Sequence, residues 1–189
     1  QTYLDDEIID VEKEKERCAR YNYQILNEDN PKRRRLFVGA MVGDDTLEVL
    51  RAVGTEGYNI FHTVSFIEGN STHSLQPKKW KYYDPVTPSK NLNTLYQLFG
   101  PKTKVSVDYY STNVDGLYGR HSDLFLDFLQ REGNSHRWAM NGMRGDDIAI
   151  VADADETFTR DFLRAMQICD IPEFHPNQDC LNSKLVGST

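Results

Sequence analysis

"RLFVGAMV" (residues 35–42) and "YNIFHTVSFIE" (residues 58–68) carry the clearest evidence for the fold class of this chain. Both are short, mainly apolar and rich in β-branched and aromatic side chains, which is typical of buried strands. Between them, "GDDTLEVLRAVG" (residues 43–54) has apolar residues at the spacing of one helix face. A strand, a helix and a second strand in this order predict a parallel α/β sheet.

The ends of this first helix are predicted from its polar residues and its glycine. Asp44 or Asp45 is placed to cap the first turn, and Glu48 is placed to complete a capping box. Gly54 is expected to end the helix, because glycine is common just past a helix C-terminus.

The rest of the chain continues the α/β pattern. We expect a peripheral helix over residues 5–27, a short helix over 91–99 and a strand over 104–110. After these we expect a helix over 121–133 that ends at Gly133, and a helix over 136–143 that is capped by Ser135. A strand with an acidic exit (146–156) and a final helix (157–166) complete the pattern. We interpret the basic run "KRRR" (residues 32–35) as a lead-in to the first strand. The expected organisation is an N-terminal segment, residues 1–34, followed by an α/β domain, residues 35–189.

"IAIVADADETF" (residues 148–158) carries the strongest chemical signal, because what looks like a buried strand ends in Asp153, Asp155 and Glu156. In an extended strand the two aspartates face the same side, roughly 6–7 Å apart. Such a pair suits Mn²⁺ or Mg²⁺, which prefer oxygen ligands and bridge phosphates. The alternative is that Asp155 or Glu156 only caps the following helix.

Two enzyme classes place acids at such a strand end. In nucleotide-sugar-dependent transferases, a D-x-D motif holds a metal that neutralises the departing diphosphate. In haloacid dehalogenase-type phosphatases, D-x-D-x-T supplies a nucleophile, an acid/base and a phosphate contact, here Asp153, Asp155 and Thr157. Chain order favours the transferase, because the motif follows a strand–helix–strand unit and only residues 158–189 remain. A non-catalytic nucleotide-sugar-binding module is a third hypothesis.

The composition and net charge of the chain restrict the classes of partner that it is expected to bind. The chain has 189 residues, enough for one domain with a real core, and a formal net charge of −7. That charge disfavours non-specific binding to nucleic acid or to an anionic membrane. Three cysteines are too few for a disulfide scaffold; Cys169 and Cys180 could pair, or the thiols could be free.

Three blocks, residues 35–78, 135–143 and 146–156, resemble glycosyltransferase family 17, the β-1,4-mannosyl-glycoprotein β-1,4-N-acetylglucosaminyltransferase family. The family's Glu-x-Asn-x-Thr…Pro-Lys pattern falls here on Glu68, Asn70, Thr72, Pro77 and Lys78. The second block carries an arginine just before the metal motif, and the third carries the D-x-D-E motif. Gly39 and Ala40 depart from the larger residues expected in the first strand.

The resemblance implies a GT-A (Rossmann-like) fold and transfer of N-acetylglucosamine from UDP-N-acetylglucosamine to a glycan or glycoprotein, with Mn²⁺ or Mg²⁺. It also implies the Golgi or the lumen of the secretory pathway, with any membrane anchor in a segment outside this chain. We expect the chain to be a piece of a longer protein, with an incomplete acceptor half and a general base beyond its C-terminal end.

The resemblance further implies a donor site. Its residues would be Glu68 at the uridine, Asn70 and Lys78 in the pocket, Arg137 near the diphosphate, and Asp153 and Asp155 at the metal and diphosphate. Asn70 also begins an N-glycosylation sequon, and a glycan there would exclude it from the pocket. The alternative for Arg137 is a surface ion pair with Asp146 or Asp147.

Overall fold

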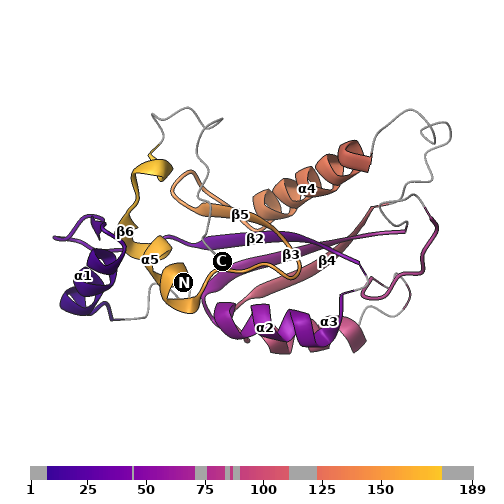
Figure 1. Cartoon of the computed structure of the whole chain (residues 1–189), viewed down its shortest axis with the longest axis horizontal. Coiled ribbons are helices and arrows are strands. Elements are labelled where there is room, and N and C mark those ends of the chain that lie inside the picture. The colour runs from indigo at the N-terminus through magenta and orange to yellow at the C-terminus, as the bar shows by residue number, and fades with distance from the viewer. Residues whose placement is uncertain are drawn as a thin grey trace. The chain divides into compact units, whose positions relative to one another are not determined.

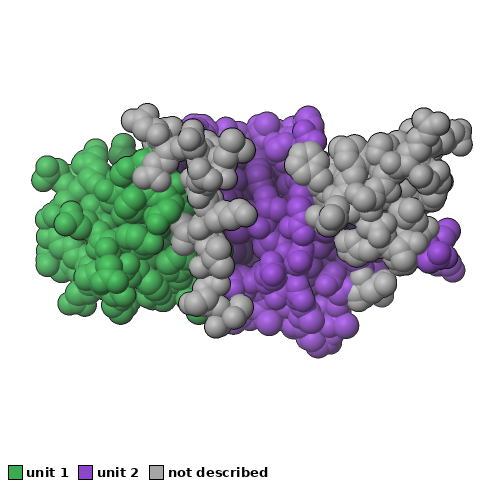
Figure 2. All heavy atoms as spheres, turned by 45° about the horizontal axis from the view of Figure 1, so that its top comes forward, with its two compact units in different colours: residues 1–35, 158–189 green, residues 36–157 purple. Residues whose placement is uncertain are grey.

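The computed structural model describes residues 8–43, 45–70, 76–83, 86, 90–110 and 123–175. The chain forms two compact units, shown in Figure 2: unit 1 joins residues 1–35 to residues 158–189, and unit 2 comprises residues 36–157. The N-terminal segment therefore shares its unit with residues that follow the acidic motif. Within the described ranges, no helix has both the length and the apolar character that crossing a bilayer requires.

Unit 2 is built on a four-stranded sheet with the strand order β4-β3-β2-β5 (Figure 1). Its strands are β2 (Leu36–Val42), β3 (Phe61–Gly69), β4 (Lys104–Tyr110) and β5 (Ile148–Asp153). All three pairings are parallel, which confirms the predicted parallel α/β class. The inner strands β2 and β3 are buried along almost their whole length, as expected of a parallel sheet with both faces covered.

Helices cover both faces of this sheet. Figure 1 shows α2 (Leu47–Gly57) and α3 (Lys90–Phe99) on one face and α4 (Asp123–Met140) on the other. The aromatic ring of Phe99 anchors α3 to the sheet, with ring centroids 6.3 Å from Phe61 and 5.9 Å from Phe66. Unit 2 therefore has three layers, and its core lies on both sides of β2 and β3.

The predicted helix caps are wrong. The N-cap of α2 is Thr46, whose Oγ1 accepts a hydrogen bond from the N–H of Val49 at 3.4 Å, and Asp45 lies before the cap. Ser135 does not begin a helix either: it lies inside α4, and its hydroxyl donates to the carbonyl oxygen of Glu132 at 2.6 Å. Serine and threonine hydroxyls bond to local backbone both at helix starts and within helices, so residue type alone did not separate the two roles.

Two glycines that were expected to end helices lie inside helices instead. A Cβ on Gly54 would lie 2.7 Å from the carbonyl oxygen of Leu98, so this glycine lets α2 and α3 approach closely. A Cβ on Gly133 would lie 2.6 Å from Cδ1 of Ile67, so α4 comes close to β3 there. The two helices predicted over residues 121–143 are therefore the single helix α4, and Gly133 allows this helix to pack closely on β3.

The close approach of α4 explains the glycine in the first strand. A Cβ on Gly39 would lie 2.5 Å from Cγ of Asn134 and 2.7 Å from Cζ2 of Trp138. Polar contacts hold the same place: Oδ1 of Asn134 accepts from the hydroxyl of Ser65 at 2.8 Å, and Nε1 of Trp138 donates to the carbonyl of Val38 at 3.3 Å. A larger residue at position 39 would displace α4 from the sheet.

Among the described strands β5 lies at the edge of the sheet, and the prediction that it is buried is wrong. Within the described residues it pairs only with β2, and α4 packs on β2 and β3. Ile148 is buried, but residues 149–153 alternate between exposed and half-buried, and Val151 is 47% exposed. An apolar run does not distinguish a central strand from an edge strand, because that depends on which neighbours the strand has.

Unit 1 contains α1 (Val11–Arg20), α5 (Arg160–Ile168), the antiparallel pair β1 (Gln24–Ile25) and β6 (Cys169–Asp170), and the 3-10 helix η2 (Pro172–Phe174). The predicted N-terminal helix is shorter than expected, because Asn22 adopts a φ of 61° and the chain then enters β1. A disulfide joins Cys18 to Cys169, with Cα atoms 5.5 Å apart. Neither alternative from the sequence holds for Cys169, which is not a free thiol and is not paired with Cys180; Cys180 itself lies outside the described residues.

Two arginines of the basic run at residues 32–35 make contacts inside unit 1. Arg33 is paired with the buried carboxylate of Glu14 at 3.1 Å. Arg34 donates to the carbonyl oxygen of Met166 at 2.8 Å, and burial lowers the pKa of its guanidinium. These arginines fasten the lead-in segment to α1 and α5.

Candidate functional site

The carboxyl ends of the four strands meet at one side of the sheet, here called the C-terminal edge. The register aligns Asp108, Ile67, Met41 and Asp153 in one row across β4, β3, β2 and β5. Residues in such a row point to the same face of the sheet, which here is the face that α4 covers. Glu68 is one residue farther along β3, so its side chain points to the opposite face. In open α/β sheets ligands bind just outside this edge.

Glu68 organises the segment of residues 78–83 above the sheet. Its carboxylate is fully buried and accepts three backbone hydrogen bonds, from the N–H of Lys81 at 2.7 Å, Tyr82 at 2.9 Å and Tyr83 at 2.6 Å. Both carboxylate oxygens are thus engaged by the protein itself. Glu68 lies at the predicted place, the end of the second strand, and there it holds a loop.

Lys78 brings a positive charge to the same place. Its Nζ lies 3.6 Å from Oε1 of Glu68 and is buried, and none of the described residues accepts a hydrogen bond from it. Its backbone N–H donates to the carbonyl oxygen of Asn70 at 2.8 Å, so the two predicted pocket residues are neighbours. A buried ammonium with three unused donors is costly, and an acceptor from a ligand would lower that cost.

A second set of bonds ties this segment to the end of β2. The carbonyl oxygen of Asp45 accepts from Nζ of Lys81 and from the hydroxyl of Tyr82, each at 2.6 Å. Oδ2 of Asp45 accepts from the N–H of Gly43 at 2.7 Å. The neighbouring Asp44 lies outside the described residues. Burial, together with the nearby carboxylates of Asp45 and Glu68, raises the pKa of Tyr82 to about 12, so its hydroxyl stays protonated and donates.

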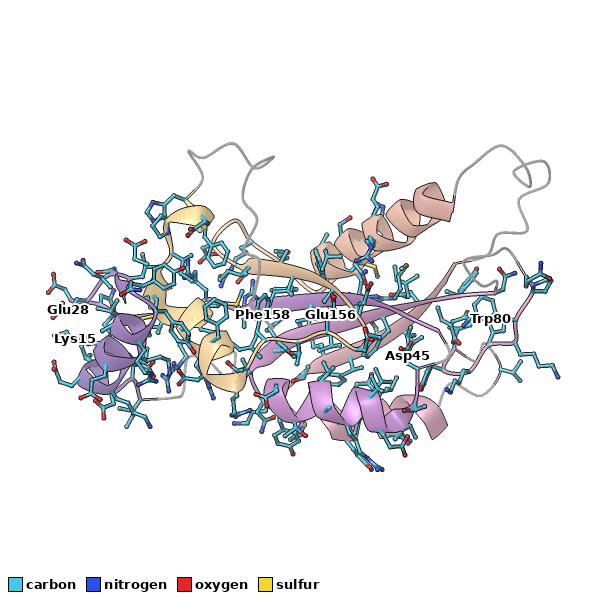
Figure 3. The ribbon with its side chains drawn as sticks, in the orientation of Figure 1. Lys15, Glu28, Asp45, Trp80, Glu156 and Phe158 are labelled. Carbon is cyan, nitrogen blue, oxygen red and sulfur yellow. A yellow bond between two sulfur atoms is a disulfide. The ribbon has the colours of Figure 1, made fainter. Side chains whose placement is uncertain are left out.

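Three aromatic side chains gather beside this segment and were not predicted as site residues. Trp80, Tyr83 and Tyr109 have ring centroids 4.8–6.0 Å apart and are here called the aromatic cluster. Figure 3 labels Trp80 and Asp45 toward the same end of unit 2. The sequence holds a signal for them, since "WKYY" is dense in aromatic residues and Tyr109 lies near the end of a predicted strand, but nothing local shows that they meet.

The acidic motif forms a turn rather than an extension of β5. The strand ends at Asp153, and the N–H of Glu156 donates to the carbonyl oxygen of Asp153 at 3.0 Å. Oε2 of Glu156, which Figure 3 labels, accepts from the N–H of Asp153 at 3.1 Å. Residues 153–156 are here called the acidic turn. The expected extended spacing of Asp153 and Asp155 is wrong, because the turn reverses the chain between them.

The helix-cap alternative for these acids is also wrong. Thr159 caps α5, with its Oγ1 accepting from the N–H of Phe162 at 3.4 Å. Glu156 closes the acidic turn instead, which gives its carboxylate a structural role. Asp155 is exposed, and its side chain makes no hydrogen bond or ion pair with the described residues. Its carboxylate is therefore available to a ligand.

Arg137 lies over the same face of the sheet as Asp153 but near β4, at the other end of the strand order from β5 and its acidic turn. Its Nε donates to Oδ2 of Asp108 at 2.8 Å and its Nη2 pairs with Oδ1, so the contact is bidentate. The hydrogen bond that the guanidinium donates to Asp108 raises the pKa of Arg137. The partner of Arg137 is thus Asp108 in β4, rather than Asp146 or Asp147.

Arg131 occupies the place beside the acidic turn. Its Nη2 donates to Oδ1 of Asp153 at 2.6 Å. Asp153 and Asp108 lie in one row but three strand spacings apart, roughly 14 Å. One helix therefore presents arginines to both edge strands, and sequence reasoning selected the one that is farther from Asp153.

The acidic turn can hold a divalent cation only together with ligands from a bound substrate. Within the described ranges, no group of three or more His, Cys, Asp and Glu side chains is placed to hold a metal ion. Asp153 and Asp155 offer two carboxylates. Mg²⁺ and similar ions are commonly held by one or two carboxylates together with substrate phosphates, so these residues suit a cation that arrives with a diphosphate.

No protein-family model matches the chain, and no curated protein or solved structure matches it at a significant level.

Proposed function

We propose that this chain is the nucleotide-sugar-binding part of a metal-dependent glycosyltransferase with a GT-A fold, related to glycosyltransferase family 17. The sugar is N-acetylglucosamine, carried by UDP, and the acceptor is a glycan. The observation that carries the proposal is the acidic turn at the C-terminal edge of a parallel sheet, where the exposed carboxylate of Asp155 engages none of the described residues.

Different residues at this edge would bind different parts of the nucleotide-sugar donor. Asp153 and Asp155 would hold Mn²⁺ or Mg²⁺ against the diphosphate. When bound, the cation neutralises charge as the bond between the sugar and the diphosphate breaks. Lys78 offers ammonium donors at the ends of β2 and β3, where an anionic or carbonyl group of the nucleotide would satisfy them. No general base is assigned.

The disulfide supports an oxidising compartment. Cys18 and Cys169 are both fully buried and joined across unit 1. Structural disulfides form and persist in the secretory pathway and are rare in the cytosol. This agrees with the Golgi or secretory lumen implied by the family resemblance, and we propose that location.

UDP binding with and without Mn²⁺ tests the proposal by isothermal titration calorimetry. We expect binding that requires Mn²⁺ and that Asp155→Asn weakens at least about tenfold, because a carboxylate ligand is lost. Asp146→Asn is the matched control: Asp146 is also an exposed aspartate, 3.7 Å from Arg144 in a surface pair. That variant should bind UDP like the wild type.

The same experiment separates the alternatives. If the folded protein binds UDP equally with Mn²⁺ and with a chelator, the transferase proposal fails. Release of phosphate from small phosphomonoesters, abolished by Asp153→Asn, would replace it with the phosphatase hypothesis. Metal-dependent UDP binding without sugar transfer by the full-length protein would favour a non-catalytic binding module.

A further inference from the structure

The aromatic cluster is an exposed feature that the proposed donor site does not use. Tyr109, at the end of β4, is 57% exposed, and Trp80 and Tyr83 are half-buried. Tyr83 and Tyr109 are tilted by 37° with centroids 4.8 Å apart, and Trp80 meets both at steep angles of 67° and 82°. Three large rings held together at the ligand-binding edge of a sheet are a candidate binding surface.

The backbone beneath the cluster is fixed before any ligand arrives. Glu68 binds the N–H groups of three consecutive residues of the segment, including Tyr83. The hydroxyl of Tyr82 and Nζ of Lys81 fasten the same segment to the carbonyl of Asp45. A surface whose side chains are already positioned loses less entropy on binding than a flexible one.

The shape and charge of the cluster indicate the class of ligand. Its rings carry no charge, which suits a neutral ligand, and its hydroxyl and indole N–H groups can bond polar substituents. Trp80 stands edge-on to both tyrosines, and Tyr83 and Tyr109 are tilted by 37° with centroids only 4.8 Å apart, so these three rings form no pair of parallel faces with room for a flat base between them. A pyranose ring fits better, since it has an apolar face of C–H bonds and a rim of hydroxyls.

We propose that the aromatic cluster is a carbohydrate subsite that binds the C–H face of a pyranose ring. Tyr109 is paired in register with Glu68, and β4 lies three strand spacings, roughly 14 Å, from the acidic turn on β5. The subsite therefore belongs to a sugar other than the one joined to the diphosphate, which makes it an acceptor subsite. That assignment rests on the proposed function, whereas sugar binding itself does not.

The intrinsic fluorescence of Trp80 tests the proposal. The chain has two tryptophans, and Trp138 is buried and bonded to the carbonyl of Val38, so a change on binding reports Trp80. The 189-residue protein is titrated with α-mannotriose and with N,N′-diacetylchitobiose in EDTA without nucleotide. We expect saturable binding of at least one of them, weakened about tenfold or more in Tyr109→Ala.

Matched variants keep the test decisive. Tyr96, on α3, is 40% exposed and outside the cluster, so Tyr96→Ala should bind like the wild type. Tyr83→Ala gives a second measurement within the cluster, and far-ultraviolet circular dichroism verifies the fold of each variant. Binding in EDTA that depends on Tyr109 supports the subsite whether or not UDP binds elsewhere.

Two outcomes overturn the proposal. One is the absence of saturable sugar binding, or sugar binding that Tyr109→Ala leaves unchanged. The other is a Trp80 response to UDP but not to the sugars, lost in Tyr109→Ala, which would make the cluster a nucleobase platform while leaving the transferase proposal intact.

Discussion

Arg131 donates to Asp153 across 2.6 Å, and this ion pair joins α4 to the end of β5 at the acidic turn. Both side chains are partly exposed, so the contact is accessible to a ligand. The guanidinium engages Oδ1 of Asp153, one of the oxygens that a cation would use. The pair orients the carboxylate, and it would compete with the proposed cation for that oxygen.

Replacing this arginine should therefore strengthen metal binding in the nucleotide-free protein. We expect Arg131→Gln to raise the affinity for Mn²⁺ about threefold, because one nearby positive charge is removed in a partly solvated site. Mn²⁺ titration followed by electron paramagnetic resonance measures this. Arg144→Gln, at an exposed arginine in a surface pair, should leave the affinity unchanged. Equal affinity in wild type and Arg131→Gln would show that the guanidinium does not compete.

The buried carboxylate of Glu68 should be essential to the segment above it. Glu68→Gln replaces one acceptor oxygen with a donor that faces backbone N–H groups, and it removes the counter-charge of Lys78. We expect a loss of about 2–4 kcal/mol in the free energy of unfolding, measured by urea denaturation.

Hydrogen exchange distinguishes this local effect from general destabilisation. The amides of Lys81, Tyr82 and Tyr83 should lose protection in Glu68→Gln under native conditions. Glu132→Gln, at an exposed position on α4, is the control and should change neither readout. Unaltered protection at all three amides would contradict the role given to Glu68.

Gly39 should be intolerant of even a methyl group. The Cβ of Gly39→Ala would lie 2.5 Å from Asn134 and 2.7 Å from Trp138, so α4 must shift. We expect about 1–3 kcal/mol of destabilisation in urea unfolding. Gly145→Ala is the matched control, since nothing lies within 4 Å of its Cβ position, and it should be neutral or slightly stabilising. Equal stability of the two variants would mean that α4 is loosely packed on β2.

Acidification should weaken unit 1 through Asp161. Burial alone would raise the pKa of this carboxyl, but hydrogen bonds from Arg20, Arg17 and Tyr21 lower it overall. The folded pKa thus lies below the unfolded value, so the stabilisation is complete above about pH 4 and is lost as the pH falls through the folded pKa.

Unfolding of Asp161→Asn at two pH values checks this sign. The side chain is 40% exposed, so solvent screening limits the effect at pH 7 to at most about 1 kcal/mol. The difference from wild type should shrink at pH 3, where the wild-type carboxyl is increasingly protonated. Asp29→Asn, at an exposed position of unit 1, should follow the wild type at both pH values. A difference that grows on acidification would refute the assignment.

Elements whose signals lie in neighbouring residues could be predicted from the sequence alone. The alternation of apolar runs and helical spacing predicted β2, α2 and β3 in order, and the β4 prediction over residues 104–110 matches the strand. From these followed the parallel α/β class and the placement of Glu68 and Asp153 at one edge. Hydrophobic periodicity is a property of neighbouring residues, so the sequence alone carries it.

Contacts between residues far apart in the chain could not be predicted and became visible in the folded protein. Gly133 looks like a helix stop until β3 is placed beside it, and Arg131 and Arg137 look equivalent until β5 and β4 are placed at opposite edges. The disulfide partner of Cys169 is 151 residues away. Each of these contacts depends on packing between elements distant in the chain, and no local pattern records it.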